Sequence, residues 1–378
     1  MWKVQLFELN YDEREVQAVE EVIRSGWITM GPKTSEFEEA FRDQLDGHLC
    51  TAVSSGTAAL HLAVLALGLE PGDEVIVPAL TFVADANAVR MVGAKPVFAD
   101  CESLENWNVG VDSVRQRITD RTRAVICVHY AGYACRMAEL RSLCDEHGLA
   151  LVEDVAHAPG GTYGDQPLGT IGDLGCFSFF TNKNLSVGEG GMVAVGDPEL
   201  DAKVRLLRSH GMTTLTLDRH EGRAISYDVL QPGLNYRIDE MRAALGLVQL
   251  AKLMASNQKR AELTAYYDSL LDGVEGLQRP FRGYEPGTNT YHIYPVLLDD
   301  RLDRDSIVGA LRTRGIQASI HYPTIPGFKA YSEEDPTATP LATEIAKREL
   351  TLPLYPTMGR TKVEMVCEAI ADAIREVN

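Results

Sequence analysis

Short apolar segments alternate with helical patterns through the first two thirds of the chain, and this alternation restricts the fold more than any other sequence feature. Six strands are expected: Glu74–Pro78, Pro96–Ala99, Ala124–His129, Leu149–Glu153, Gly175–Phe179 and Met192–Val195. Several contain unbroken apolar runs, such as residues 125–128, which suit parallel strands buried on both faces. Helices are expected between them, for example over Thr57–Leu67 and Met137–His147. The alternation therefore predicts an α/β fold with a mostly parallel sheet.

Two helices are expected in the N-terminal segment. Two residue pairs there have the spacing of capping boxes: Asp12 with Glu15, and Ser35 with Glu38. Each helix also carries an apolar stripe, formed by Val16, Val19 and Ile23 in the first helix and by Phe37, Phe41 and Leu45 in the second. Such stripes are typical of amphipathic helices.

The last third of the chain has a different pattern. A long helix is expected over Asp239–Leu271, where few helix breakers occur, and it would connect two domains. Four segments follow it: a β-like segment over Thr290–Leu297, a helix over Asp305–Arg314, proline-rich loops over Tyr322–Pro340 and a final helix over Lys362–Glu376. Because 378 residues suit two domains, we divide the chain into a large domain (residues 1–250) and a smaller C-terminal α+β domain (residues 251–378).

Composition excludes several classes of protein. No run of about 18 apolar residues occurs, so no membrane helix is expected, and the first residues lack the pattern of a signal peptide. The seven cysteines are scattered, so we expect neither a disulfide framework nor a metal site, and a cytoplasmic protein. The net charge of −18 without a run of Lys or Arg argues against binding nucleic acid, and we interpret the acidity as favouring solubility.

Three short segments could carry chemistry, although each has an ordinary structural explanation. Residues 54–60 place Gly56 and Thr57 at the start of an expected helix, where exposed amides can bind an anion, or where a glycine turn simply precedes a helix. Glu153 and Asp154 end an apolar strand, where they could meet a cationic ligand or cap the next turn. His157 alone carries little weight.

The third segment contains Lys183, between an apolar strand and the glycine-rich residues 188–191. Most lysines are solvated, but a partly buried lysine can have a lowered pKa and form a Schiff base. Pyridoxal phosphate requires a lysine amine, a carboxylate near its pyridine nitrogen and donors for its phosphate. The chain offers all three, so pyridoxal 5'-phosphate is the cofactor that these segments predict together.

Six motifs, in order, resemble those of the DegT/DnrJ/EryC1/StrS family of sugar aminotransferases, and the resemblance spans nearly the whole chain. They comprise residues 25–32, 54–62, 78–88, 153–158, 183–191 and 235–240. The resemblance implies a fold-type-I enzyme, similar to aspartate aminotransferase, with a large domain and a smaller C-terminal α+β domain. It also implies a homodimer in which both subunits contribute to each active site.

The resemblance assigns roles to the residues that match the motifs. Lys183 matches the Schiff-base lysine, and Asp154 matches the aspartate that pairs with the pyridinium nitrogen. His157 matches the position beside the ring hydroxyl. The family's dehydratase branch has histidine in place of the lysine, so Lys183 favours transamination.

Further cofactor contacts follow in the same way. Gly56, Thr57 and Ser178 match phosphate contacts, and Phe82 matches the aromatic side chain that lies against the ring. Asn235 matches a residue that reaches the phosphate from the neighbouring subunit.

The acceptor is less defined than the cofactor. Phe180 stands where many relatives have histidine, and this form of the motif is similar to the perosamine-synthase branch, which aminates nucleotide-linked 4-keto-6-deoxy sugars. Glu189 and His321 are candidate substrate contacts. We therefore expect transfer of an amino group from L-glutamate, or glutamine, to such a keto sugar.

Two alternative functions remain open. The acceptor could instead be an aminocyclitol ketone or the aldehyde of a higher sugar. The chain could also be a regulator that binds pyridoxal phosphate without turnover, although the intact Lys183 and Asp154 and the lack of a basic DNA-binding segment count against this alternative.

Overall fold

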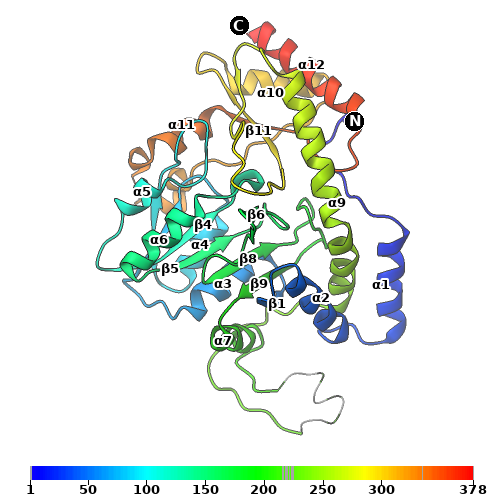
Figure 1. Cartoon of the computed structure of the whole chain (residues 1–378), viewed down its shortest axis with the longest axis vertical. Coiled ribbons are helices and arrows are strands. Elements are labelled where there is room, and N and C mark those ends of the chain that lie inside the picture. Colours follow the sequence, from blue (N-terminus) through cyan, green and yellow to red (C-terminus); the bar gives the residue numbers. More distant parts are fainter. Residues whose placement is uncertain are drawn as a thin grey trace.

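A seven-stranded sheet forms the centre of the computed structural model, which describes residues 2–214, 217, 220, 222, 225–333 and 335–377 (Figure 1). In spatial order its strands are β1 (Leu49–Val53), β9 (Gly191–Val195), β8 (Leu174–Ser178), β5 (Ala150–Asp154), β4 (Thr122–Val128), β2 (Glu74–Pro78) and β3 (Lys95–Ala99). The strands from β8 to β3 are parallel, whereas β9 is antiparallel to both β8 and β1. Because two reversals restore the direction, β1 ends at the same edge as the parallel strands.

The mostly parallel sheet confirms the expected fold class. The six strands expected in the first two thirds of the chain are all present, with ends shifted by at most two residues. All residues of β2 and β9 are buried, and full burial of each Val or Ile side chain contributes about 1.5–3 kcal/mol. Strand β1 was not expected, because its central Thr51 interrupts the apolar run. Thr51 donates to Asp201 at 2.8 Å, which makes its burial tolerable.

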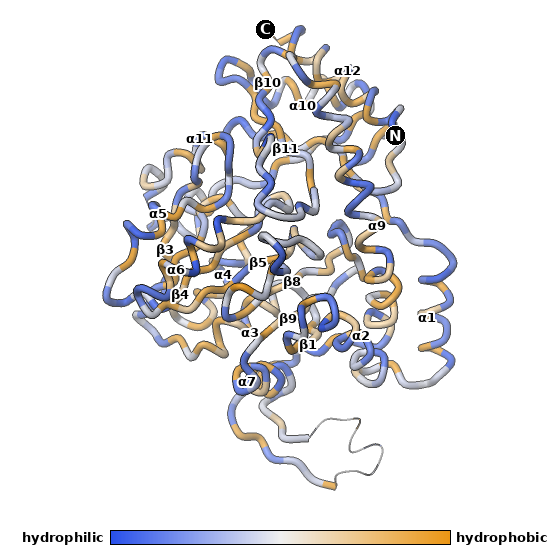
Figure 2. The backbone as a smooth tube through the Cα atoms, in the orientation of Figure 1, coloured by the Kyte–Doolittle hydropathy of each residue, from blue (hydrophilic) through white to orange (hydrophobic). Residues whose placement is uncertain are grey.

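Helices cover both faces of the sheet. One core cluster contains buried residues of α3 (Gly56–Ala66), α4 (Ala84–Met91) and α7 (Pro198–Arg208). The other contains buried residues of α2 (Pro32–Asp43), α5 (Val111–Arg115), α6 (Met137–His147) and α9 (Glu240–Leu270). In Figure 2 hydrophobic residues concentrate in the central strands between these layers. Among the described residues, no helix combines the length and apolar character that crossing a bilayer requires.

The first helix, α1 (Glu13–Ser25), has the expected capping box of Asp12 and Glu15. Its expected apolar stripe is largely exposed, with Val16 and Ile23 each 58% accessible, because α1 packs through Glu15 and Val22 instead.

The second expected capping box is wrong. Helix α2 begins at Pro32, which places Ser35 inside its first turn. The Glu38 carboxylate instead accepts from the Ala52 amide at 2.9 Å and pairs with Arg205 and Arg208, each at 2.7 Å.

Glu240, the first residue of α9, caps α2 from 209 positions away. Its carboxylate accepts from the amides of Gly31 (2.8 Å), Lys33 (2.7 Å) and Thr34 (2.9 Å). It also accepts from the Thr34 hydroxyl at 2.7 Å. A carboxylate at a helix N-terminus satisfies amides that lack intrahelical partners and is favoured by the helix dipole.

The C-terminal part contains a second, three-stranded antiparallel sheet of β10 (Leu277–Gln278), β11 (Tyr294–Leu298) and β12 (Glu349–Leu352). The helices α10 (Arg304–Thr313), α11 (Pro340–Arg348) and α12 (Arg360–Val377) accompany it. Between residues 322 and 340 the chain forms three short 3₁₀ helices: Ile325–Gly327, Lys329–Tyr331 and Pro336–Ala338. Smaller elements elsewhere are β6 (Thr162–Tyr163), β7 (Gln166–Pro167) and a 3₁₀ turn at Tyr130–Gly132.

Helix α9 joins the two parts, as expected from the sequence. Its residues Ala243 and Leu253 pack in the core beneath the large sheet, whereas Leu263 and Tyr267 pack in a third core that also holds Val4. In Figure 1 the helix runs from the large sheet towards α12. The division after residue 250, which lies inside this helix, stays a prediction.

Candidate active site

A cavity of about 450 Å³ lies at the carboxyl edge of the large sheet. Loops that follow β1, β2, β5 and β8 line it, which is where open α/β sheets bind ligands. Nine of the ten predicted site residues line this cavity: Gly56, Thr57, Phe82, Asp154, His157, Ser178, Lys183, Glu189 and His321. The tenth, Asn235, is exposed and is not among the residues that line it.

The N-terminus of α3 forms one wall. Ser55 caps the helix, since its hydroxyl accepts from the Ala58 amide at 3.0 Å. The Gly56 and Thr57 amides, in the first turn, have no intrahelical acceptor and form a positive helix end. A Cβ at Gly56 would lie 2.7 Å from the Ser178 Cβ, so only glycine allows Ser178 to approach this helix end so closely. The wall suits a phosphate group.

Lys183 lies across the cavity in the turn after β8, where its amide donates to Phe180 O at 2.8 Å. Burial lowers the pKa of Lys183 to about 8, while the charge of Asp154 acts in the opposite direction. At that pKa roughly a tenth of the amines are neutral at pH 7, a far larger share than for a solvated lysine. A neutral amine can attack an aldehyde.

The residue after Lys183 is anchored by other parts of the chain. The side-chain nitrogen of Asn184, Nδ2, donates to Asn257 Oδ1 on α9 and to Thr290 O, both at 2.9 Å. His292 Nδ1 lies 2.9 Å from Asn184 Oδ1. These bonds fix the backbone that carries Lys183.

Asp154 ends β5, and its Oδ1 accepts from the Ala156 amide at 2.7 Å. A second carboxyl group, that of Asp85 on α4, is fully buried near Asp154, and its Oδ1 has no hydrogen-bond partner among the described residues. Its other oxygen accepts from the Thr81 hydroxyl at 2.8 Å. Burial, followed by the charge of Asp154, raises the pKa of Asp85 well above its ordinary value. Burial raises the pKa of Asp154 as well, while the Ala156 amide and the charge of Lys183 act in the opposite direction. Of the two carboxyl groups, Asp85 is therefore the one that holds a proton.

His157 is buried beside the cavity. Its Nδ1 accepts from the Ala131 amide at 3.2 Å, so Nε2 carries the proton of the neutral ring and faces the Tyr322 hydroxyl at 3.0 Å. Burial, together with the charge of Lys183, lowers the pKa of His157 well below its ordinary value. His157 is therefore a hydrogen-bond donor and not a cation at neutral pH.

Three residues of this region were not identified from the sequence. Tyr322 reaches His157 from 165 positions away, so no local pattern could reveal it. The Asn182 Oδ1 atom is buried without a partner among the described residues, beside Lys183. Asp85 did have a signal, since it is a carboxylate in an otherwise apolar stretch, three residues after Phe82.

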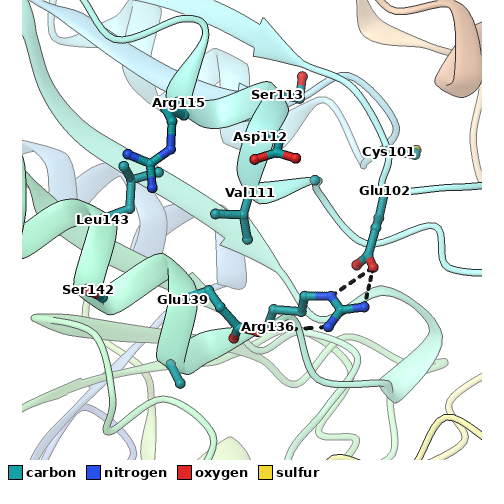
Figure 3. Close-up of a pocket in the computed structure, with 12 residues that line it drawn as sticks. Cys101, Glu102, Val111, Asp112, Ser113, Arg115, Arg136, Glu139, Ser142 and Leu143 are labelled. Carbon is teal, nitrogen blue, oxygen red and sulfur yellow. Dashed lines mark hydrogen bonds and ion pairs between the residues drawn. The ribbon is translucent and has the colours of Figure 1, made fainter.

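A larger depression, of about 700 Å³, lies between α5 and α6, and no predicted site residue lines it (Figure 3). Its cations are already paired: Arg136 with Glu102 at 2.5 Å, and Arg115 with Glu146 at 3.3 Å. The smaller cavity at the sheet edge is therefore the better candidate for an active site.

The anion-binding helix end, the Asp154 carboxylate and the Lys183 amine fit the phosphate, ring nitrogen and aldehyde of pyridoxal phosphate. This site on this fold defines a pyridoxal-phosphate-dependent aminotransferase of fold type I. The sequence pattern of the DegT/DnrJ/EryC1/StrS aminotransferase family matches residues 10–371. The chain belongs to this family.

Individual relatives agree with this assignment. The chain is 37% identical to the spore coat polysaccharide biosynthesis protein SpsC of Bacillus subtilis, over 96% of this chain and 95% of SpsC. The structure of Spr1654 from Streptococcus pneumoniae in its PMP form is similar, with a TM-score of 0.94, 30% identity and full coverage of both chains. Helicobacter pylori PseC, an aminotransferase involved in the biosynthesis of pseudoaminic acid, has a TM-score of 0.92, 28% identity and 99% coverage of both chains. The family and its neighbours make this chain a sugar aminotransferase and imply pyridoxal phosphate as its cofactor.

Proposed function

We propose that this chain is a cytoplasmic aminotransferase that transfers an amino group from L-glutamate to a nucleotide-linked 4-keto-6-deoxy sugar. The observation that carries the proposal is the meeting of Lys183, Asp154 and the N-terminus of α3 around one cavity. The motif at Phe180 supports this class of acceptor, and three aromatic side chains, Phe82, Phe180 and Tyr322, give the cavity flat surfaces for a ring.

Lys183 is the proposed catalytic residue. Pyridoxal phosphate, when bound, accepts the amino group of the donor and passes it to the acceptor. Lys183 Nζ removes the proton from the donor Cα, because its lowered pKa leaves part of the amine neutral near pH 7. In the transfer to the acceptor, the same amine moves the proton in the opposite direction.

The other residues bind and orient. The Asp154 carboxylate holds a proton on the ring nitrogen, since an opposite charge favours the charged form. His157 donates from Nε2 towards the ring hydroxyl, and Gly56, Thr57 and Ser178 bind the phosphate. Glu189 and His321 contact the substrates.

A homodimer completes the proposed site. Asn235 is exposed and lies outside the lining of its own cavity, which supports a role in the partner's site. Val229 and Leu230, a few residues earlier, are 49% and 64% exposed, as expected for apolar side chains that a second subunit would cover.

A visible spectrum of the purified protein, before and after addition of L-glutamate without acceptor, tests the proposal. We expect an absorption band of the lysine-linked cofactor that decays on addition of glutamate. A band that ignores glutamate would redirect the search to glutamine or another donor. A protein that shows no band after reconstitution would not have the cofactor chemistry proposed for Lys183.

Matched lysine variants separate the catalytic role from general effects. Lys183→Ala should lose the band and all steady-state turnover, whereas Lys259→Ala, which removes an exposed lysine of α9, should retain both. Appreciable turnover by Lys183→Ala would remove Lys183 from its role. Asp154→Asn should slow turnover strongly without loss of the fold.

The acceptor is tested by a screen in which the glutamate-treated protein meets keto sugars with and without a linked nucleotide. Return of the original band with a nucleotide-linked 4-keto-6-deoxy sugar alone would support the proposed acceptor. Return with an aminocyclitol ketone or a higher-sugar aldehyde would replace it.

A further inference from the structure

His321 is held in the cavity wall by two residues of β12. Its backbone amide donates to Glu349 Oε2 at 2.8 Å, and its Nδ1 lies 2.9 Å from Thr351 Oγ1. The Thr351 hydroxyl in turn lies 2.5 Å from Glu349 Oε1. A chain of hydrogen bonds therefore runs from the Glu349 carboxyl group, through one hydroxyl, to the imidazole that lines the cavity.

The number of protons in this hydrogen-bond chain fixes the tautomer of His321. Burial and the charge of Lys183 lower the pKa of His321 to about 4, so the ring is neutral and carries one N–H. When Glu349 is ionised, both its oxygens accept, and the single proton of Thr351 points to Oε1. The Thr351 oxygen then accepts from His321 Nδ1–H, which leaves Nε2 without a proton.

Adding one proton to Glu349 reverses the direction of donation along this hydrogen-bond chain. Its Oε2 still accepts from the His321 amide, so the proton taken from solvent lies on Oε1 and is donated to Thr351 Oγ1. The Thr351 hydroxyl must then donate to His321 Nδ1, and the ring proton moves to Nε2. The His321 ring stays neutral, and the hydrogen-bond chain gains only the proton that entered at Glu349.

We propose that Glu349 and Thr351 are positioning residues for His321, and that the protonation state of Glu349 decides whether His321 Nε2 accepts or donates a hydrogen bond in the cavity. The unprotonated Nε2 accepts from a hydroxyl or ammonium group. The protonated Nε2 donates to a keto oxygen or a phosphate. This inference deepens the proposed function, on which it rests only for the presence of a substrate in this cavity.

The surroundings allow Glu349 to change its protonation state near neutral pH. Glu349 is fully buried, and burial raises its pKa to about 7, while its bonds to Thr351 and His321 and the charge of Arg304 act in the opposite direction. Arg304 contacts the backbone oxygen of Glu349 at 3.2 Å and not its carboxylate.

The other titratable groups near this hydrogen-bond chain keep their protonation states over the same pH range. They are Tyr130, whose hydroxyl donates to His321 O, and Tyr322, His157, His292 and Lys183. Burial raises the pKa of both tyrosines and lowers that of both other histidines, so neither pair changes charge near pH 7. In the holoprotein Lys183 is bonded to the cofactor, which removes its free amine.

The test measures the ring nitrogens directly, on the cofactor-loaded protein labelled with ¹⁵N-histidine, at pH 6 and pH 8. The signals of His321 are those that a His321→Asn variant lacks. We expect the Nε2 signal of the natural protein to shift from the protonated to the unprotonated position as the pH rises.

Variants identify the cause of that shift. In Glu349→Gln the side-chain amide donates to Thr351, as the protonated carboxyl group does, so Nε2 should stay protonated at both pH values. Thr351→Val should abolish the pH response, and Thr351→Ser, which keeps the hydroxyl, should restore it.

An unprotonated Nε2 in Glu349→Gln at pH 8, or an unchanged pH response in Thr351→Val, would overturn the inference. Thermal unfolding and the cofactor band establish that each variant is folded, and if one variant fails to fold, the other still decides. The ring signals do not depend on turnover, so they distinguish a failure of this inference from a failure of the proposed transamination.

Discussion

At the scale of single residues, burial determines the protonation states around the cavity. It lowers the pKa of Lys183 and of His157 and raises that of Asp85. These three shifts oppose charges that transamination does not need: a permanent ammonium, an imidazolium and a second carboxylate. Burial also raises the pKa of Asp154, but the Ala156 amide and the charge of Lys183 act in the opposite direction and favour the charge that the cofactor ring requires.

Gly56 offers a test of the close contact between α3 and β8. In Gly56→Ala the new methyl group would meet Ser178 at 2.7 Å, and overpacking of this kind costs about 1–3 kcal/mol. We expect a lower free energy of unfolding in urea and weaker binding of pyridoxal phosphate. Gly309→Ala in α10, where a Cβ meets nothing within 4 Å, should be neutral or stabilise by about 0.5–1 kcal/mol.

Glu349 should make stability depend on pH. Its pKa in the folded protein, about 7, exceeds the ordinary value of 4.5, so between these values the folded state binds more protons than the unfolded state. This contribution is present at low pH and is lost as the pH rises to about 7. Glu349→Gln has no proton to lose, so its stability relative to the natural protein should rise by up to roughly 3 kcal/mol from pH 5 to pH 8.

Urea unfolding of both proteins at the two pH values measures this difference. Glu344→Gln, which alters a partly exposed carboxylate paired with Arg348, is the control and should show little pH dependence relative to the natural protein. An equal difference for Glu349→Gln at pH 5 and pH 8 would contradict the prediction.

At the scale of elements, local patterns and long-range contacts determine different features. The expected strands could be located because an unbroken apolar run is a property of neighbouring residues. The cap of α2 could not, because Glu240 lies far from the helix in sequence. The spacing of Ser35 and Glu38 suggested a capping box that does not form, because Glu38 forms ion pairs with Arg205 and Arg208 instead.

The Glu240 cap should be worth more than a surface ion pair. Glu240→Ala would leave three backbone amides and one hydroxyl without their acceptor, so we expect a loss of about 2–4 kcal/mol in the free energy of unfolding. Glu36→Ala removes an exposed pair with Lys33 in the same helix and should cost less than about 1 kcal/mol. Equal losses in the free energy of unfolding would show that the Glu240 cap contributes no more than a surface ion pair.

At the scale of the whole molecule, the cavity gathers segments that the sequence holds far apart. Lys183, Asp154 and Gly56 could be predicted because each lies at or after the end of a strand, and all strands of the large sheet but β9 end at one edge. Tyr322, Glu349 and Thr351 come from the C-terminal part, and only the tertiary structure brings them to the same cavity. The contribution of Asn235 to a partner's cavity stays a prediction.

Hybrid dimers test that contribution. If each site combines Lys183 of one subunit with Asn235 of the other, a dimer of one Lys183→Ala and one Asn235→Ala subunit has one intact site and one doubly altered site. Equal mixing after dissociation should then restore activity to about a quarter of the natural value, although each variant alone is impaired. Activity equal to the average of the two separate variants would exclude a shared site.

The capping of α2 by Glu240 also has a consequence for synthesis of the chain. A ribosome makes Gly31 209 residues before Glu240, which at 5–20 residues per second is roughly 10–40 s. For that time the first-turn amides of α2 lack the Glu240 carboxylate that accepts from them in the folded chain, and the buried face of α2 has no α9 to pack against. The nascent N-terminal segment is therefore the part of this enzyme that we expect chaperones to bind.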